Sequence, residues 1–364
     1  MKVIFYPSHS DSNDYVKLAT EALETNGCEI INRLWNGDFK LILFSLLEVI
    51  KNKELIFHFN WLEDNASKKG FLPRIKCELL LLFMSLFYAL GGRLVWTMHN
   101  AKSHNDKCSY QRKFIKRMLK RISLVVVHCS ESISLLNNQY GYSKEQILFV
   151  PHGNYCNAID AYLHDINNLS NEVKRVRFVY FGTVSPYKGV ETLIKAFDCN
   201  DLRGNAELYI CGKPNSEELK GKIEEKANNI PEIHLDMRFL SNRDLCDIIS
   251  KCDVAVLPYD KESMQNSGSA IMALTCGKAI IIPLFGYIKD IADKGFVFSY
   301  DYSNEQERIY NLRIKMQEFC KKIIDQPDYG IILGRQAREF AKSELDWSYI
   351  MKTVSNRYSQ LFKV

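Results

Sequence analysis

The chain has 364 residues, of which 46% are hydrophobic and 25% are charged, so it is long enough for two folded domains and is not intrinsically disordered. Its formal net charge of +5 is small for this length and gives no support to a nucleic-acid-binding protein. The eleven cysteines occur singly, without a C-x-x-C pair, which indicates reduced thiols rather than a zinc or redox site.

The apolar segments of the chain are too short to span a membrane. Residues 1–6 are apolar over the length of a strand only, and polar residues follow at once, so we expect no secretory leader. The closest approach to a spanning segment, residues 79–90, falls short of the roughly 20 residues that a spanning helix needs. We therefore expect a cytoplasmic protein.

Short strand-like segments alternate with segments of helical periodicity. In the first half, strands are predicted at residues 3–6, 55–59, 93–98, 124–128 and 147–150, and the helices include residues 15–26 and 108–121. In the second half, strands are predicted at residues 177–182, 206–211, 234–235, 254–258 and 279–282, and residues 331–364 have a helical pattern. This alternation is typical of βαβ units around a parallel sheet.

The strands form two successive sets of about five, with the polar segment 160–174 between them. Two such sets predict an α/β fold of two doubly wound, Rossmann-like domains. A (β/α)8 barrel is the alternative, but it would need evenly spaced units without the polar break. We predict domains at residues 1–165 and 166–345, followed by a helix at residues 346–364.

The strongest local signal runs from Phe181 to Gly189, between a predicted strand and a predicted helix. Gly182 allows the backbone to approach a ligand closely, and Lys188 brings a positive charge near the exposed N–H groups of the helix. Together they suit a diphosphate. An ordinary turn with a solvated lysine explains the same residues equally well.

A second signal follows the predicted strand 254–258, where Ser267, Gly268 and Ser269 open a helix that ends near Gly277. Free N–H groups, two hydroxyls and the absence of a bulky side chain again suit phosphate. Simple N-capping by a serine is the alternative. The position favours ligand binding, because open α/β sheets bind ligands beyond the carboxyl ends of their strands.

The order of these motifs resembles glycosyltransferase family 4. The resemblance lies in residues 181–189, 209–212, 253–259, 267–277 and 280–283, and it thins in the first half to residues 97–100 and 151–154. It implies the GT-B fold, in which two Rossmann-like domains face a cleft. The first domain would bind the acceptor, the second would bind a nucleotide sugar without a metal or other cofactor, and the final helix would cross back to the first domain.

The resemblance also implies roles for individual residues. Lys188 would hold the donor diphosphate, and the amides of residues 267–269 would hold the distal phosphate or the sugar. The residues predicted to bind the donor are Gly182, Thr183, Lys188, Lys213, Tyr259, Ser267, Gly268 and Ser269. His99 would lie near the transferred sugar and is the predicted catalytic residue, and the predicted acceptor residues are His9, Asn13, Asn100 and His152.

Two departures from the family pattern concern the donor. Thr183 stands where many members carry arginine, and Met264 and Met272 stand where members carry two glutamates separated by seven residues. Glu262 and Gln265 lie nearby but do not restore that spacing. Contacts to the donor sugar must therefore differ in this chain.

An inverting enzyme would need a base near the acceptor hydroxyl. The loops of the first domain offer His9, Asp11, Asp14 and Asp106. A histidine that follows a strand, as His99 and His152 do, can also be purely structural, but the Thr-x-His-Asn context of His99 favours a function.

Two basic segments suggest that the acceptor lies at a membrane. Residues 68–76 precede the apolar run, and residues 111–121 hold six basic side chains interleaved with Phe114, Ile115, Met118 and Leu119. A basic amphipathic helix is typical of an anionic membrane surface. The alternative is a solvated surface helix whose apolar side enters the domain core.

We predict a metal-independent hexosyltransferase that moves a sugar from a UDP- or GDP-linked donor to a lipid-linked saccharide. The product would be a bacterial cell-surface polysaccharide such as O-antigen, with retention favoured over inversion. The partners are the nucleotide sugar, the acceptor and the anionic inner face of the cell membrane, without nucleic acid. The alternatives are an epimerase or phosphorylase of the GT-B type and a nucleotide-binding or scaffolding protein without activity.

Overall fold

The computed structural model of the protein describes residues 1–8, 14–32, 38–62, 70–100, 109–163 and 175–363. By its internal contacts the chain divides into two compact units, Met1–Gly153 with Leu345–Val364, and Asn154–Glu344. The first unit ends before the predicted boundary at residue 165, because Asn154 and Tyr155 bond within the second unit. Asn154 Nδ2 donates to the Ala341 carbonyl (2.8 Å), and the Tyr155 N–H donates to Thr275 Oγ1 (3.2 Å).

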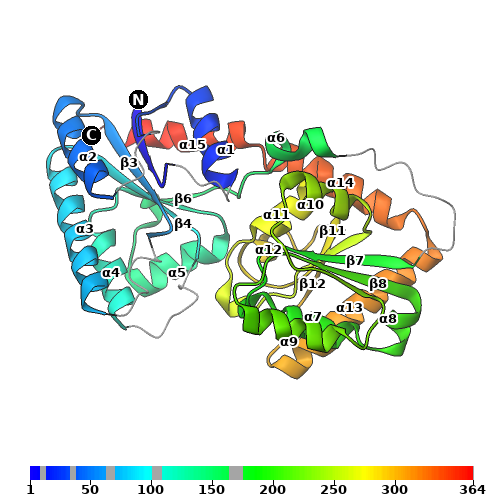
Figure 1. Cartoon of the computed structure of the whole chain (residues 1–364). Helices are drawn as coiled ribbons and strands as arrows, with labels where there is room; N and C mark the ends of the chain where they lie inside the picture. The colour runs from blue at the N-terminus through cyan, green and yellow to red at the C-terminus, as the bar shows by residue number, and fades with distance from the viewer. Residues whose placement is uncertain (9–13, 33–37, 63–69, 101–108, 164–174, 364) are drawn as a thin grey trace. The chain divides into compact units, whose positions relative to one another are not determined.

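The first unit is built on a six-stranded sheet with the order β2-β1-β3-β4-β5-β6, in which all neighbours are parallel (Figure 1). Its strands are β1 (Lys2–Tyr6), β2 (Glu29–Ile30), β3 (Leu55–Asn60), β4 (Arg93–Met98), β5 (Leu124–Val127) and β6 (Ile147–Phe149). Its helices are α1 (Asp14–Thr25), α2 (Asp38–Lys51), α3 (Phe71–Ala89), α4 (Ser109–Leu119), α5 (Ser130–Tyr140) and α15 (Trp347–Gln360).

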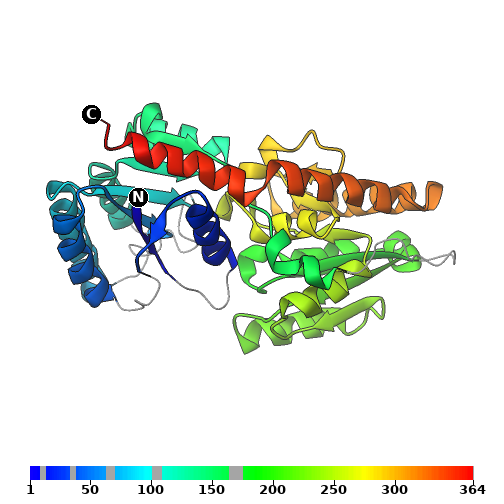
Figure 2. The same ribbon diagram turned by 90° about the horizontal axis from the view of Figure 1, so that it is seen from above.

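Helix α15 packs against α1, although most of the chain separates them in sequence. Figure 2 shows α15 in red and α1 in dark blue on the same side of the first sheet. Asn26 Nδ2 donates to the Ser348 carbonyl (3.0 Å), and Arg93 Nε donates to the Leu361 carbonyl (3.0 Å). Both ends of the terminal helix are therefore tied to the first unit.

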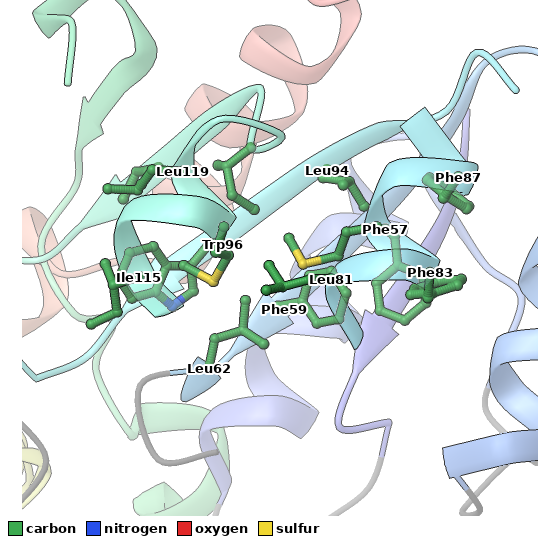
Figure 3. Packing of buried hydrophobic residues seen from close by; sticks show 14 of the residues in the cluster. Phe57, Phe59, Leu62, Leu81, Phe83, Phe87, Leu94, Trp96, Ile115 and Leu119 are labelled. Carbon is green, nitrogen blue, oxygen red and sulfur yellow. The ribbon is translucent and has the colours of Figure 1, made fainter. Parts of the chain in front are cut away.

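The core of the first unit lies between the sheet and helices α3 and α4. Figure 3 shows Phe57, Phe59 and Trp96 from the sheet close to Leu81, Phe83 and Phe87 of α3 and to Ile115 and Leu119 of α4. All of these side chains are buried. Strand β3 is buried along its whole length, as expected for a parallel strand that is covered on both faces.

The second unit has a parallel sheet with the order β12-β11-β10-β7-β8-β9. Its strands are β7 (Val176–Phe181), β8 (Ala206–Cys211), β9 (Ile233–Asp236), β10 (Val254–Val256), β11 (Ala279–Pro283) and β12 (Val297–Tyr300). Its helices are α6 (Cys156–Ile159), α7 (Val190–Phe197), α8 (Asn200–Asn205), α9 (Glu217–Ala227), α10 (Asn242–Ser250), α11 (Gly268–Thr275), α12 (Gly286–Asp290), α13 (Glu305–Asp325) and α14 (Tyr329–Glu344). Helices α7, α8 and α13 pack together on one face of the sheet, and α11 and α14 pack together on the other (Figure 1).

The two Rossmann-like domains predicted from the sequence are confirmed, and both sheets are open rather than closed into a barrel. Each sheet has one edge strand that the sequence analysis did not predict. Strand β2 has only two residues, and β12 has half-buried residues in its middle instead of an alternating pattern. None of the described helices is both long enough and apolar enough to cross a bilayer.

Candidate functional site

The carboxyl ends of β7, β8 and β10 bring the two predicted donor motifs together. Strand β7 lies between β8 and β10, so the direction in which the chain adds strands reverses at β7. At such a switch point the loops that follow neighbouring strands diverge, and ligands bind between them. Residues 182–189 follow β7, and residues 257–267 lead from β10 to α11.

Two glycines allow the loops after β7 and β8 to approach each other. Gly182 and Gly212 have φ angles of 114° and 146°, a region that other residues rarely adopt. A Cβ atom on Gly212 would lie 1.9 Å from the Gly182 carbonyl oxygen, and one on Gly182 would lie 3.0 Å from Ser269 Oγ. The glycine loop and the serine motif, 87 residues apart in the chain between Gly182 and Ser269, are therefore neighbours in space.

The two serines at the start of α11 have different roles. Ser267 is the N-cap, because its Oγ accepts from the Ala270 N–H (3.1 Å), and its hydroxyl also donates to the Tyr259 hydroxyl (3.3 Å). Ser267 is buried, so its hydroxyl serves the fold. Ser269 Oγ is half-buried and makes no hydrogen bond within the described part of the chain. Ser269 and the first N–H groups of α11 are thus the donors suited to a ligand.

Lys188 lies over an aromatic ring beside the same loops. It ends the short turn Pro186–Lys188, and its Nζ is 4.2 Å from the ring centroid of the buried Tyr259. This cation–π contact orients the ammonium group. No carboxylate of the described residues forms an ion pair with Lys188, so its charge is available to an anionic ligand.

The remaining predicted donor residues lie on the same loops. Gly268 is the first residue of α11, and the side chains of Thr183 and Lys213 are exposed after the two glycines. Met264 and Met272, at the positions of the family glutamates, are 8% and 7% exposed. Their thioethers present no carboxylate to a sugar.

In the first unit, four neighbouring strands each have a histidine within them or just after them. His58 lies in β3, and His99, His128 and His152 follow β4, β5 and β6. The ring centroids of His99 and His128 lie 5.3 Å apart and those of His128 and His152 lie 5.7 Å apart, and His58 continues the series on the next strand, β3. All four are buried, with at most 8% of the residue exposed. We call this set the histidine row.

Aromatic side chains surround the histidine row. The ring centroid of Tyr15, from α1, lies 4.8 Å from that of His99 and 5.1 Å from that of His152. Trp347, from α15, lies 5.2 Å from Tyr15. Trp61 stacks on His99 at 4.3 Å with an interplanar angle of 16°. Among the described residues Trp61 alone has a positive φ without being glycine (53°), and backbone strain of this kind concentrates at functional sites.

Both imidazole nitrogens of His128 and of His58 make hydrogen bonds. His128 Nδ1 donates to the Val150 carbonyl (2.9 Å), so its Nε2 accepts from the Tyr15 hydroxyl (3.2 Å). His58 bonds through Nδ1 to the Tyr358 hydroxyl of α15, and its Nε2 lies 2.6 Å from a threonine hydroxyl of β4. These two imidazoles therefore serve the structure.

For His99, the hydrogen bond to Asn60 identifies the nitrogen that carries the proton. Asn60 Nδ2 donates to the Tyr6 carbonyl (3.2 Å), which leaves Asn60 Oδ1 facing His99. This oxygen lies 3.2 Å from His99 Nε2 and can only accept, so the imidazole proton resides on Nε2. Nδ1 then carries the lone pair.

Burial lowers the pKa of every imidazole in the row, because a buried site disfavours the charged form. The pKa of His58 and that of His152 fall to about 3, with repulsion from His128 as the second cause. The pKa of His128 falls to about 4. For His99, burial and then the three neighbouring histidines hold the pKa well below its usual value. The row is therefore neutral at pH 7.

The predicted acceptor residues are only partly described. Asn100 follows His99 and is half-buried, and His152 Nδ1 donates to the Gly153 carbonyl (2.7 Å). Asp14 begins α1. The residues His9, Asp11, Asn13 and Asp106 lie outside the described residues.

The sequence analysis identified His99 and His152 but missed Tyr15, Trp61 and the other two members of the row. A signal was present in the sequence, because His99, His128 and His152 end or follow three successive predicted strands and His58 lies within the strand before them. No group of three or more His, Cys, Asp or Glu side chains in the described segments could hold a metal ion. The ten cysteines found there are free thiols.

The basic segment predicted at residues 111–121 falls largely on α4, and its apolar side lies in the core. Phe114, Ile115, Met118 and Leu119 are at most 6% exposed, so they are not available to lipid. The basic side chains lie on the outer face, where Arg117 forms a bidentate pair with Glu78 of α3 (2.6 and 2.7 Å). Of the two alternatives for the apolar side of α4, burial in the domain core is the one observed.

Comparisons with known proteins agree with this architecture. Residues 175–311 match the family model "Glycosyl transferases group 1". A GDP-mannose:glycolipid 4-beta-D-mannosyltransferase of Xanthomonas campestris pv. campestris is 26% identical over 265 residues, which cover 71% of this chain and 70% of that protein. A second protein of the same description, from the same pathovar, is 25% identical over 275 residues.

Two solved structures share the fold over almost the whole chain. Sucrose-phosphate synthase from Thermosynechococcus elongatus matches with a TM-score of 0.70 at 15% identity, covering 100% of this chain and 99% of its own. HepE from Anabaena, in complex with UDP-glucose, matches with a TM-score of 0.67 at 13% identity, covering 99% and 100%.

Two Rossmann-like units, each built on a parallel six-stranded sheet, together with these structural matches show the GT-B class of fold. Taken with the family match in that unit and the mannosyltransferase relatives, they show that the chain is a GT-B glycosyltransferase.

Proposed function

We propose that the enzyme transfers mannose from GDP-mannose to the saccharide of a lipid-linked acceptor, in the synthesis of a bacterial cell-surface polysaccharide such as O-antigen. By their descriptions, the Xanthomonas relatives use GDP-mannose and act on a glycolipid, and the alignment with each covers 71% of this chain. The main support for binding of a nucleotide sugar is that Gly182, Lys188 and the start of α11 lie together at one switch point of the second sheet.

The donor site is suited to a diphosphate without a metal ion. Lys188 supplies a full positive charge, and the N–H groups at the start of α11 supply partial positive charges. Groups that are held in place before the reaction stabilise the negative charge that develops on the departing GDP. We therefore propose a metal-independent enzyme that needs no cofactor beyond its nucleotide-sugar substrate.

We propose inversion at the anomeric carbon in place of the retention favoured by family resemblance. The mannose of GDP-mannose is α-linked, so a 4-beta product such as that of the relatives requires inversion. The buried Met264 and Met272 support this choice, because the glutamate pair typical of the retaining family is missing.

Inversion requires a base, and His99 is our candidate. Its neutral imidazole, protonated on Nε2, can accept the proton of the acceptor hydroxyl at Nδ1. As that proton leaves, the acceptor oxygen forms a bond to C1 of mannose from the face opposite the phosphate. The bond from C1 to the phosphate oxygen breaks, and GDP leaves with the electron pair.

We propose that the enzyme acts at the cytoplasmic face of the membrane. GDP-mannose is a soluble donor, whereas a lipid-linked acceptor remains in the bilayer. The exposed basic face of α4, with Lys113, Lys116 and Lys120, suits an anionic lipid surface.

Thermal stabilisation by nucleotide sugars tests the donor, because a ligand that binds the folded state raises the melting temperature. GDP-mannose and GDP should stabilise the enzyme more than UDP-glucose or UDP. Transfer of labelled mannose to a lipid extract, followed by digestion with β- or α-mannosidase, then tests the reaction. Stabilisation by UDP compounds alone would refute GDP-mannose as the donor. An α-linked product would show that the anomeric configuration is retained.

A further inference from the structure

The outer faces of α2 and α3 expose a stripe of large apolar side chains. On α3 these are Phe71, Leu72, Ile75, Leu79, Leu82 and Leu86, which are 39% to 78% exposed. Their spacing of mainly three and four residues puts them on one side of the helix. On α2, which packs beside α3 (Figure 1), Leu43, Leu47 and Ile50 are 51% to 62% exposed. We call these nine residues the apolar stripe.

The core of the first unit does not need the apolar stripe. The opposite side of α3 already supplies Cys77, Leu81, Met84 and Phe87, which are at most 2% exposed. Figure 3 shows Leu81 and Phe87 directed into the core. Single exposed leucines are common on protein surfaces, but nine large exposed apolar side chains on two adjacent helices are typical of an interaction surface.

Basic side chains flank the apolar stripe. Arg74 and Lys76 are exposed in the first turns of α3. Helix α4, which packs against α3, exposes Arg112, Lys113 and Lys116, and Lys120 is exposed in the turn that follows α4. The acidic side chains Glu48 and Glu78 form ion pairs with Lys51 and Arg117, at 3.0 and 2.6 Å. The surface around the stripe is therefore apolar in the middle and positive at its edge.

We infer that the apolar stripe inserts into the headgroup and upper acyl region of an anionic bilayer, with α2 and α3 lying in the plane of the interface. Helices with one apolar face and flanking Lys and Arg residues bind membranes in this way. A second copy of the chain fits less well, because a two-fold contact would bring the two basic edges face to face. The apolar contact is thus on α2 and α3, whereas α4 contributes only charge.

The inference rests on the proposed lipid-linked acceptor, but vesicle binding tests it without donor or acceptor. The probes are vesicles of phosphatidylcholine alone and of phosphatidylcholine with phosphatidylglycerol, measured by co-sedimentation at low and high salt. The stripe variant carries Leu79→Gln, Leu82→Gln and Leu86→Gln. The charge variant carries Lys113→Gln, Lys116→Gln and Lys120→Gln, and the control carries Phe239→Gln, Tyr310→Gln and Ile324→Gln, which replace exposed apolar residues of the second unit.

The parent and the control should bind the anionic vesicles and keep part of this binding at high salt, because salt screens charges but not apolar insertion. The stripe variant should bind at least tenfold more weakly at both salt concentrations, and the charge variant should lose binding mainly at low salt. Circular dichroism checks that each variant is folded, and the single substitutions Leu79→Gln and Leu82→Gln replace the triple variant if it is not.

Equal vesicle binding by the parent and the stripe variant overturns the inference. So does a dimer of the parent in analytical ultracentrifugation that is lost in the stripe variant, without vesicle binding by either. The proposed function fails independently, if vesicles bind as expected but no mannose is transferred to any lipid extract.

Discussion

Asn60 Oδ1 lies 3.2 Å from His99 Nε2, and this contact determines which imidazole nitrogen can act as a base. The donation from Asn60 Nδ2 to the Tyr6 carbonyl fixes the amide, and the stacked Trp61 fixes the plane of the imidazole. Three residues near the ends of β1 and β3 therefore orient a side chain that follows β4.

Asn60→Asp should raise the pKa of His99, because a carboxylate stabilises the imidazolium form. The base is inactive when protonated, so the pH below which kcat/KM falls should move upward. Asn60→Leu removes the acceptor and should lower kcat by about 10- to 100-fold, with little change in the KM for GDP-mannose. A pH–rate profile of Asn60→Asp that overlays that of the parent would argue against His99 as the base.

Lys188→Ala should weaken the binding of GDP while the enzyme stays folded, because the side chain ends on a loop and pairs with no carboxylate among the described residues. A hydrogen bond to a charged group contributes roughly 1.5–3 kcal/mol, which corresponds to a Kd about 10- to 100-fold higher. Calorimetric titration with GDP measures the change. Lys195→Ala, an exposed lysine on α7, is the control. If both variants bind GDP as the parent does, Lys188 does not contact the diphosphate.

Gly212→Ala should destabilise the second unit and abolish donor binding. The new Cβ would meet the Gly182 carbonyl at 1.9 Å, and the φ of 146° is unfavourable for alanine, a combination that costs on the order of 1–3 kcal/mol or more. Gly221→Ala in α9 meets no atom within 4 Å and should instead stabilise the protein by about 0.5–1 kcal/mol. Urea denaturation compares the two. Similar stability of both variants would contradict the close approach of the two loops.

The histidine row should make the first unit sensitive to acid. Each imidazole has a lower pKa in the folded than in the unfolded state, so below pH 6.5 the unfolded state binds more protons. The free energy of unfolding should therefore decrease as the pH falls from about 6.5 to about 4, by up to about 1.4 kcal/mol per pH unit for each histidine. Above pH 7 these histidines should not change the free energy of unfolding, because they are neutral in both the folded and the unfolded state.

Thermal unfolding between pH 4 and 8 measures this dependence. His128→Gln should make the decrease less steep, whereas His234→Gln, an exposed histidine of the second unit, serves as the control. The explanation fails if the two variants have the same pH dependence.

EDTA should leave mannosyl transfer unchanged, because Lys188 and the N–H groups of α11 supply the positive charge that a metal would provide elsewhere. Initial rates with EDTA and with added Mg²⁺ or Mn²⁺ are the measurement. Loss of activity in EDTA that either metal restores would contradict the proposed donor site.

The sequence by itself determined the class of fold and predicted the two loops that meet at the switch point of the second sheet. Apolar runs of strand length between amphipathic segments indicate βαβ units directly, since each strand of a parallel sheet is buried on both faces. The glycine after β7 and the serines before α11 could also be recognised in the sequence. A positive φ favours glycine, and the start of a helix favours serine. The edge strands β2 and β12 lack these signals, and both were missed.

Only the tertiary structure decided how separate segments combine. Tyr15, Trp61, Trp347 and the histidine row come from three distant parts of the chain, and their contacts depend on strand order and on the packing of α15. The helical periodicity of α3 and α4 shows that apolar residues recur, but not which side of a helix meets the sheet. Packing buries the apolar side of α4 in the core. Helix α3 is apolar on two sides, and because only one of them faces the sheet, the apolar stripe stays exposed.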